Sequence, residues 1–150
     1  MKLSRVSSTL VGLGLAVTAA VGLGAGTANA APAKPFQSFT IGQELALGSS
    51  CVGRATGNVL VQPARGHANI DVYWIGQTPF SPCTERATVH WYNLNTHRSG
   101  VVGGPLTYRS MWQQGVASAD VFVGSGPVRF TLTADRPLQF PPAPFTLVMP

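Results

Sequence analysis

Residues 128–135, Val-Arg-Phe-Thr-Leu-Thr-Ala-Asp, alternate apolar and polar side chains without interruption. The even-numbered positions carry Val, Phe, Leu and Ala, and the odd-numbered positions carry Arg, Thr, Thr and Asp. Successive side chains of a β-strand point to opposite faces, so this pattern predicts a strand with one buried face and one face in water. Such strands are typical of antiparallel sheets.

Similar alternating runs fill most of the chain, and they cover residues 36–41, 44–47, 57–62, 69–75, 87–94, 99–102, 117–123 and 144–149. Segments rich in Gly, Pro, Asn and Ser separate them, as expected of turns. The stretch Leu106 to Gly115 fits either a strand or a short helical turn. Seven to nine short strands predict an all-β fold, an antiparallel β-sandwich of immunoglobulin-like architecture. A small closed β-barrel is the alternative, because strand number does not separate the two.

The first thirty residues have the pattern of a secretory signal peptide. Lys2 and Arg5 precede an uncharged run, and Ala28-Asn29-Ala30 supplies the small residues of a cleavage site. The run is rich in glycine, which argues against a transmembrane anchor. We therefore expect cleavage after Ala30, a flexible leader over 31–35 and a single domain over 36–150. The product would be extracellular, in the medium or at the cell wall, without a membrane span.

Export decides how the two cysteines are interpreted. Outside the cell, an isolated pair in a small domain is more often a disulfide than two free thiols. Cys51 and Cys83 both lie in turn-like sequence, so we expect one disulfide that joins two loops. A reactive thiol would need a close C-x-x-C pair or a basic helix start, and the chain has neither.

Charge limits the partners that the chain can bind. The formal net charge is +5, and charged residues make up only 10% of the chain. Lys2 and Arg5 belong to the predicted signal peptide, so eight basic and five acidic residues remain, a net charge of +3. The remaining arginines are scattered singly, whereas nucleic-acid-binding proteins cluster them. We expect no nucleic acid partner; weak attraction to anionic cell-wall polymers is compatible with +3.

Alternation also assigns the aromatic residues to faces. Trp74 and Trp91 fall on the apolar faces of their runs and are expected in the core. Five other residues are not claimed by an inner face and form the candidate binding set: Tyr73, His90, Tyr92, Tyr108 and Trp112. A β-sandwich that exposes aromatic rings can stack them on sugars, although half-exposed tyrosines are common on any protein surface.

Residues that could perform catalysis are sparse. No two of the five acids after residue 30 are closer than 14 positions, so only the fold could form a carboxylate pair. His90 with Asp71 is the most plausible pairing for a Ser-His-Asp arrangement, and the chain has no G-x-S-x-G motif. The histidines lack metal-ligand spacing, and no Gly-rich loop opens a helix. We expect neither metal nor cofactor, and a non-enzymatic protein; a small secreted hydrolase using His90 or His67 is the alternative.

Two segments carry a resemblance to known proteins. Residues 87–94, Ala-Thr-Val-His-Trp-Tyr-Asn-Leu, and 125–131, Ser-Gly-Pro-Val-Arg-Phe-Thr, together with the signal peptide and the Ala, Gly, Pro, Val and Arg content, resemble small secreted actinobacterial proteins with immunoglobulin-like β-sandwiches. The resemblance implies the fold and the export and transfers no functional residue. We expect a protein that binds an unknown extracellular or cell-envelope partner. A glycan-binding module using the exposed aromatics is the second alternative.

Overall fold

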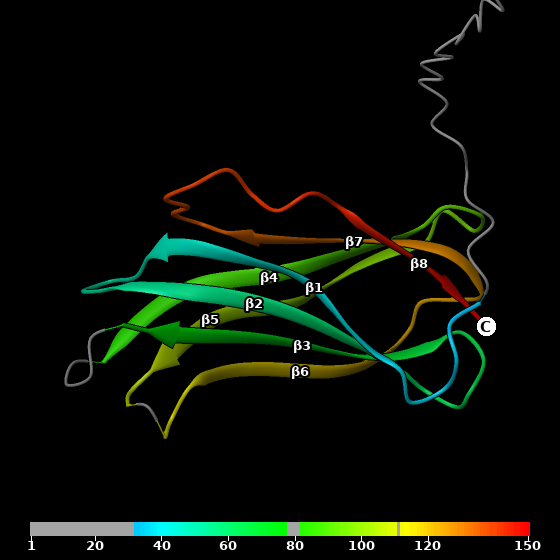
Figure 1. The fold of residues 1–150 in the computed structure, drawn as a ribbon, viewed down its shortest axis with the longest axis horizontal. Coiled ribbons are helices and arrows are strands. Elements are labelled where there is room, and N and C mark those ends of the chain that lie inside the picture. Colours follow the sequence, from blue (N-terminus) through cyan, green and yellow to red (C-terminus); the bar gives the residue numbers. More distant parts are fainter. Residues whose placement is uncertain (1–31, 78–81, 111) are drawn as a thin grey trace, which may run out of the picture.

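The computed structural model describes residues 32–77, 82–110 and 112–150 (Figure 1). The predicted signal peptide lies outside these residues. The described chain forms β1 (Ser38–Leu47), β2 (Val52–Val61), β3 (His67–Gly76), β4 (Cys83–Asn93), β5 (Ser99–Tyr108), β6 (Gly115–Phe122), β7 (Gly126–Ala134) and β8 (Phe145–Met149). Within the described residues, no helix is long and apolar enough to cross a membrane.

The eight strands form two antiparallel sheets packed face to face. The first sheet has the order β1-β2-β3-β6, and the second has the order β5-β4-β7-β8. Figure 1 shows the two layers and the connections that pass between them. The predicted β-sandwich is confirmed, and the fold is not a closed barrel. Immunoglobulin constant domains instead place their first, second, fifth and fourth strands in one sheet, so the layered architecture is shared and the strand order differs.

Alternation along β7 and β4 builds the core as the sequence predicts. Val128, Phe130 and Leu132 of β7 are fully buried between the sheets. Trp74 and Trp91 are buried as well, which confirms their expected place in the core. The indole N–H of Trp74 donates a hydrogen bond of 3.2 Å to the carbonyl of Cys83, so its polar group is satisfied in the interior.

β1 and β5 extend beyond the predicted runs because irregularities shift the alternation inside them. β1 joins two predicted runs through a bulge between Thr40 and Gly42. β5 continues through Gly103, whose φ is +123°. A Cβ at this position would collide with the carbonyl oxygen of Ala87, so only glycine fits. The first residues of Leu106–Gly115 are therefore strand, and an isolated β-bridge pairs Ser110 with Gln113.

The N-terminal leader is attached to the sandwich at one point. Ala33 is buried, and its N–H donates a 2.8 Å hydrogen bond to the carbonyl of Val148 in β8. Phe36 donates its N–H to the carbonyl of Val61 at 2.7 Å. Ala33 thus lies along β8, at the edge of the second sheet.

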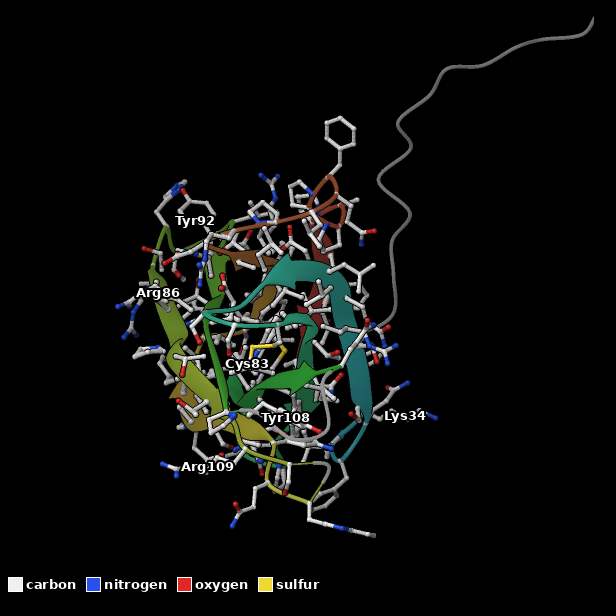
Figure 2. The ribbon with its side chains drawn as sticks, turned by 90° about the vertical axis from the view of Figure 1, so that its left-hand side faces the viewer. Lys34, Cys83, Arg86, Tyr92, Tyr108 and Arg109 are labelled. Atoms are coloured by element: carbon white, nitrogen blue, oxygen red, sulfur yellow. A yellow bond between two sulfur atoms is a disulfide. The ribbon has the colours of Figure 1, made fainter. Side chains whose placement is uncertain are left out.

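The predicted disulfide between Cys51 and Cys83 is present, with the two Cα atoms 5.9 Å apart. Cys51 directly precedes β2 in the first sheet, and Cys83 is the first residue of β4 in the second. The bond therefore ties one sheet to the other, instead of joining two loops. Figure 2 shows it in the interior of this end of the sandwich.

Removing the disulfide should destabilise the fold strongly. The double variant C51A/C83A is expected to lose about 3–4 kcal/mol of unfolding free energy, because its unfolded chain gains the freedom of a loop of 32 residues. Urea denaturation of the variant and the oxidised wild type measures this difference. Reduced wild type is the control and should match the variant. A loss below about 1 kcal/mol would contradict a structural role for this bond.

Candidate functional site

A hollow of about 230 Å³ lies on the outer face of the second sheet. Three adjacent strands supply two outward side chains each: His90 and Tyr92 from β4, Ser99 and Val101 from β5, Arg129 and Thr131 from β7. Figure 2 shows Tyr92 and Arg86 on this face, both projecting away from the core. The residues between them along each strand point inward and belong to the core. The lining side chains therefore stand on three well-packed neighbouring strands.

Strand register arranges the lining side chains in two rows. Tyr92 lies opposite Ser99 on one side and Arg129 on the other. In the next row, His90 lies opposite Val101 and Thr131. Side chains opposite each other on one face of an antiparallel pair have Cβ atoms about 4.5–5.5 Å apart. A single small ligand can therefore contact the aromatic ring and the guanidinium at once.

Hydrogen bonds fix the two ring side chains of the hollow. The Tyr92 hydroxyl and Nδ1 of His97 are 2.7 Å apart, and His97 sits in the β4–β5 turn with a φ of +59°. Nε2 of His90 lies 3.2 Å from the Thr88 hydroxyl, which also bonds the Thr133 hydroxyl at 2.9 Å. Tyr92 still exposes 38% of its surface. Its ring is thus held in place and accessible.

The lining of the hollow is mostly apolar, and a few polar side chains are set into it. It contains Arg129 and His90 and no carboxylate. The nearest acid along β7, Asp135, forms an ion pair of 3.5 Å with Arg86 farther along the same face. Neither of the two ion pairs among the described residues involves Arg129. The N–H donors of its guanidinium can therefore bind a ligand, and a carboxylate or phosphate group is the best acceptor for them.

The other candidate residues do not join this hollow. Tyr73 lies on the outer face of the first sheet, and its hydroxyl donates to Asp71 at 3.2 Å. Burial raises the pKa of Tyr73, and the neighbouring Asp71 charge and hydrogen bond raise it further. Trp112, 87% exposed, lies in the β5–β6 connection. Of the five predicted residues, the fold brings together only His90 and Tyr92.

The expectation that Tyr108 lies on an outer face is wrong, because only 3% of its surface is exposed. β5 continues through its glycines, so the alternation places Tyr108 on the same inner face as Val102 and Leu106. Its ring packs where Gly76 leaves space, beside the disulfide. Figure 2 shows Tyr108 below Cys83 in the end-on view. Tyr108 therefore belongs to the core.

Sequence reasoning did not include Arg129, Thr131, Ser99 and Val101 in the candidate site. Alternation does place Arg129 and Thr131 on the outward face of their strand. The missing information is that β7 and β5 flank β4, which is a property of the strand order.

The described residues do not form the arrangement that a hydrolase based on His90 or His67 would need. His90 and Asp71 lie on the outer faces of different sheets, so they do not form a dyad. The ring of His67 packs on Phe122 with centroids 5.1 Å apart. Asp120, near His67, instead accepts a 3.1 Å hydrogen bond from the side chain of Asn69. Among the described residues, no group of three His, Cys, Asp or Glu side chains could hold a metal ion.

The fold does form a carboxylate pair, in the interior. Glu44 of β1 and Glu85 of β4 are each 1% exposed. Glu85 accepts hydrogen bonds from the backbone N–H of Arg136 at 3.0 Å and from its guanidinium at 3.3 Å. Neither carboxyl oxygen of Glu44 has a hydrogen-bond partner within the described protein. Because both carboxyls are enclosed, the pair offers no surface to a substrate.

Burial raises the pKa of Glu44, and the negative charge of Glu85 raises it further. The backbone N–H of Ala134 opposes this shift, although it does not reach hydrogen-bond geometry with the carboxyl. The charged form of Glu44 is thus the less favourable one in the folded chain.

Comparison with protein-family models, with curated proteins and with solved structures finds no match for this chain. The chemistry of the hollow on the second sheet is therefore the basis on which a function can be assigned.

Replacing Glu44 with Gln is expected to raise the unfolding free energy at pH 7, because Gln leaves no buried negative charge near Glu85. The folded chain binds the Glu44 proton more tightly than the unfolded chain, so wild-type stability falls as the pH rises above the usual value of 4.5. Gln has no proton to lose. The advantage of Glu44→Gln should therefore grow with pH from about 4.5 upward and be absent in more acidic solution, as urea denaturation at several pH values measures.

Glu85→Gln is the matched control for this test. Glu85 accepts two hydrogen bonds from Arg136, one of them charge-assisted, so its replacement should destabilise the protein at pH 7. A stability difference for Glu44→Gln that stays constant with pH would show that ionisation of Glu44 is not the cause.

Proposed function

We propose that this chain is an exported, non-enzymatic binding protein that holds an anionic glycan of the cell envelope in the hollow around Tyr92 and Arg129. The observation that carries the proposal is the arrangement of an exposed, hydrogen-bonded aromatic ring beside a guanidinium that has no ion-pair partner in the described part of the chain, in a lining without carboxylates.

Each lining group has a distinct role toward such a ligand. The face of Tyr92 stacks on the apolar face of a sugar ring, and the tyrosine hydroxyl stays hydrogen-bonded to His97. Arg129 offers two parallel N–H donors, which match a carboxylate or phosphate oxygen pair. Ser99 and Thr131 place a hydroxyl at two sides of the hollow for the sugar hydroxyls.

The size of the hollow favours one charged sugar unit within a polymer. Its volume of about 230 Å³ is below the 300–1,000 Å³ typical of pockets that enclose a whole small molecule. A single unit would bind weakly, and the charged part of the binding would decrease with salt. A repeating polymer offsets this weakness, because it offers many equivalent units to each copy of the protein.

Export is part of the proposal and rests on two independent features. The disulfide between Cys51 and Cys83 is of the kind that persists in oxidising compartments. The sequence of residues 1–30 has the charge, apolar run and small-residue end of a signal peptide. The likeness of the chain to small secreted actinobacterial sandwich proteins agrees with both.

Binding to soluble anionic and neutral polysaccharides, measured by isothermal titration calorimetry, tests the proposed function. Polymers that carry uronic acid or phosphate groups should bind, and a neutral glucan should not. Arg129→Ala and Tyr92→Ala should each weaken binding about tenfold or more, because each removes one of the two main contacts. Raising the salt concentration should weaken the wild type more than Arg129→Ala.

Tyr73→Phe and Trp112→Ala are the controls, since both residues lie outside the hollow and should leave the affinity unchanged. Equal binding of neutral and anionic polymers, or wild-type affinity in Arg129→Ala, would contradict the proposal.

A further inference from the structure

Phe140 is the most exposed large apolar side chain among the described residues, with 96% of its surface in contact with solvent. It lies in the connection between β7 and β8, where residues 137–144 read Pro-Leu-Gln-Phe-Pro-Pro-Ala-Pro. Leu138, two residues earlier, is 49% exposed. We call residues 137–144 the proline loop. They carry no charge, and Phe140 projects from them into solvent.

The proline loop is anchored on both sides of Phe140. Leu138 donates its N–H to the carbonyl of Leu45 in β1 at 2.9 Å. On the other side, the ring of Pro142 fills the space left by Gly42, where a Cβ would lie 2.7 Å from the proline Cγ. Four prolines fix the backbone φ within eight residues. Little conformational entropy is therefore left to lose when Phe140 is buried by a partner.

An apolar hollow of about 460 Å³ lies on the same edge of the sandwich, between the first half of β1 and β8. Phe39, Phe145 and Leu147 line it, and the leader closes one side with Ala33 and Lys34. The rings of Phe39 and Phe145 pack with centroids 5.9 Å apart. A volume in the range of ligand pockets accommodates a phenyl ring.

The projection and the hollow are arranged so that a two-fold axis can pair them. Figure 1 shows the proline loop and β8 one after the other along one edge, the loop near one end of the sandwich and β8 toward the other. Rotating a second copy by 180° about an axis between them brings each projection opposite the other copy's hollow. Such a contact is isologous and closes after two copies, so it forms a dimer and not a fibre.

We propose that two copies of this chain associate through this edge, with Phe140 of each copy inserted into the hollow beside Phe39 and Phe145 of the other. The partner is a second copy because one chain carries both complementary parts on a single edge.

The charge and the area of this edge support a second copy as the partner, and the area indicates a weak dimer. The proline loop is uncharged, so two copies with a net positive charge can approach along it. Lys34, at the wall of the hollow, can place its ammonium over the face of the incoming Phe140 ring, which is a favourable cation–π contact. Two phenyl rings of about 200 Å² each, two leucines and the two hollows bury on the order of 1,000 Å², the lower limit of a specific interface. The dimer is therefore weak and concentration-dependent.

Sedimentation equilibrium of the purified protein tests the proposal. The wild type should change from monomer to dimer as its concentration rises from about 1 μM to about 1 mM. Phe140→Ser should remain monomeric throughout that range. Trp112→Ser is the matched control: it removes an equally exposed aromatic residue, 87% in solvent, from a different loop, and should associate like the wild type.

The variant Lys34→Glu tests the contribution of the hollow and leaves Phe140 unchanged. It should weaken association several-fold, although it lowers the net positive charge of each copy and so reduces their repulsion. Phe140 and Lys34 are exposed, and unfolding by urea should confirm that both variants keep wild-type stability.

A wild type that is monomeric at about 1 mM would overturn the proposal, as would association that Phe140→Ser leaves unchanged or that Trp112→Ser abolishes equally. The glycan proposal is independent, because its hollow lies on the outer face of the second sheet and Phe140→Ser leaves that hollow intact.

Discussion

The register of β4 between β5 and β7 is the constraint on which the rest of the structure depends. Because the side-chain period of a strand is two, this single register fixes both faces of the second sheet together. Inward, it places Trp91 between Phe130 of β7 and Gly100 of β5. Outward, it places Tyr92 between Arg129 and Ser99. A slip by one residue would bury the polar lining of the hollow and expose the core, so the stability of the sandwich and the geometry of the site are maintained by the same pairing.

One end of the sandwich combines a strong covalent link with an unfavourable buried charge. The disulfide joins the two sheets there, and Glu44 and Glu85 lie enclosed between them. The segment after β7 covers this end: Arg136 bonds Glu85 with its backbone and side chain, and its carbonyl accepts the N–H of Leu47. The same segment continues as the proline loop. The anchoring of the exposed Phe140 therefore begins at the residues that satisfy a buried carboxylate.

The proposed glycan site and the proposed dimer contact use different surfaces, and they are compatible. The hollow around Tyr92 lies on the face of the second sheet, whereas Phe140 and its complement lie along the edge formed by β1 and β8. A two-fold dimer would leave both faces open and join two sites in one particle. For a repeating polymer, such pairing raises the effective concentration of the second site and so strengthens weak contacts. The low charge content of the chain suits this division between a small hollow with one arginine and an uncharged edge.

The alternating pattern predicted the β-sandwich and the two buried tryptophans, because alternation reports which way each side chain points, and two cysteines allow only one pairing. Tertiary structure decided which strands are neighbours. It brought Arg129 beside Tyr92 and Glu44 near Glu85, and it placed the proline loop and the hollow between β1 and β8 along one edge. It also moved Tyr108 into the core, since glycines with positive φ carry β5 past the point where the pattern fades. The physical reason is that a period of two is a local property of the chain, whereas strand order depends on contacts between residues far apart in sequence.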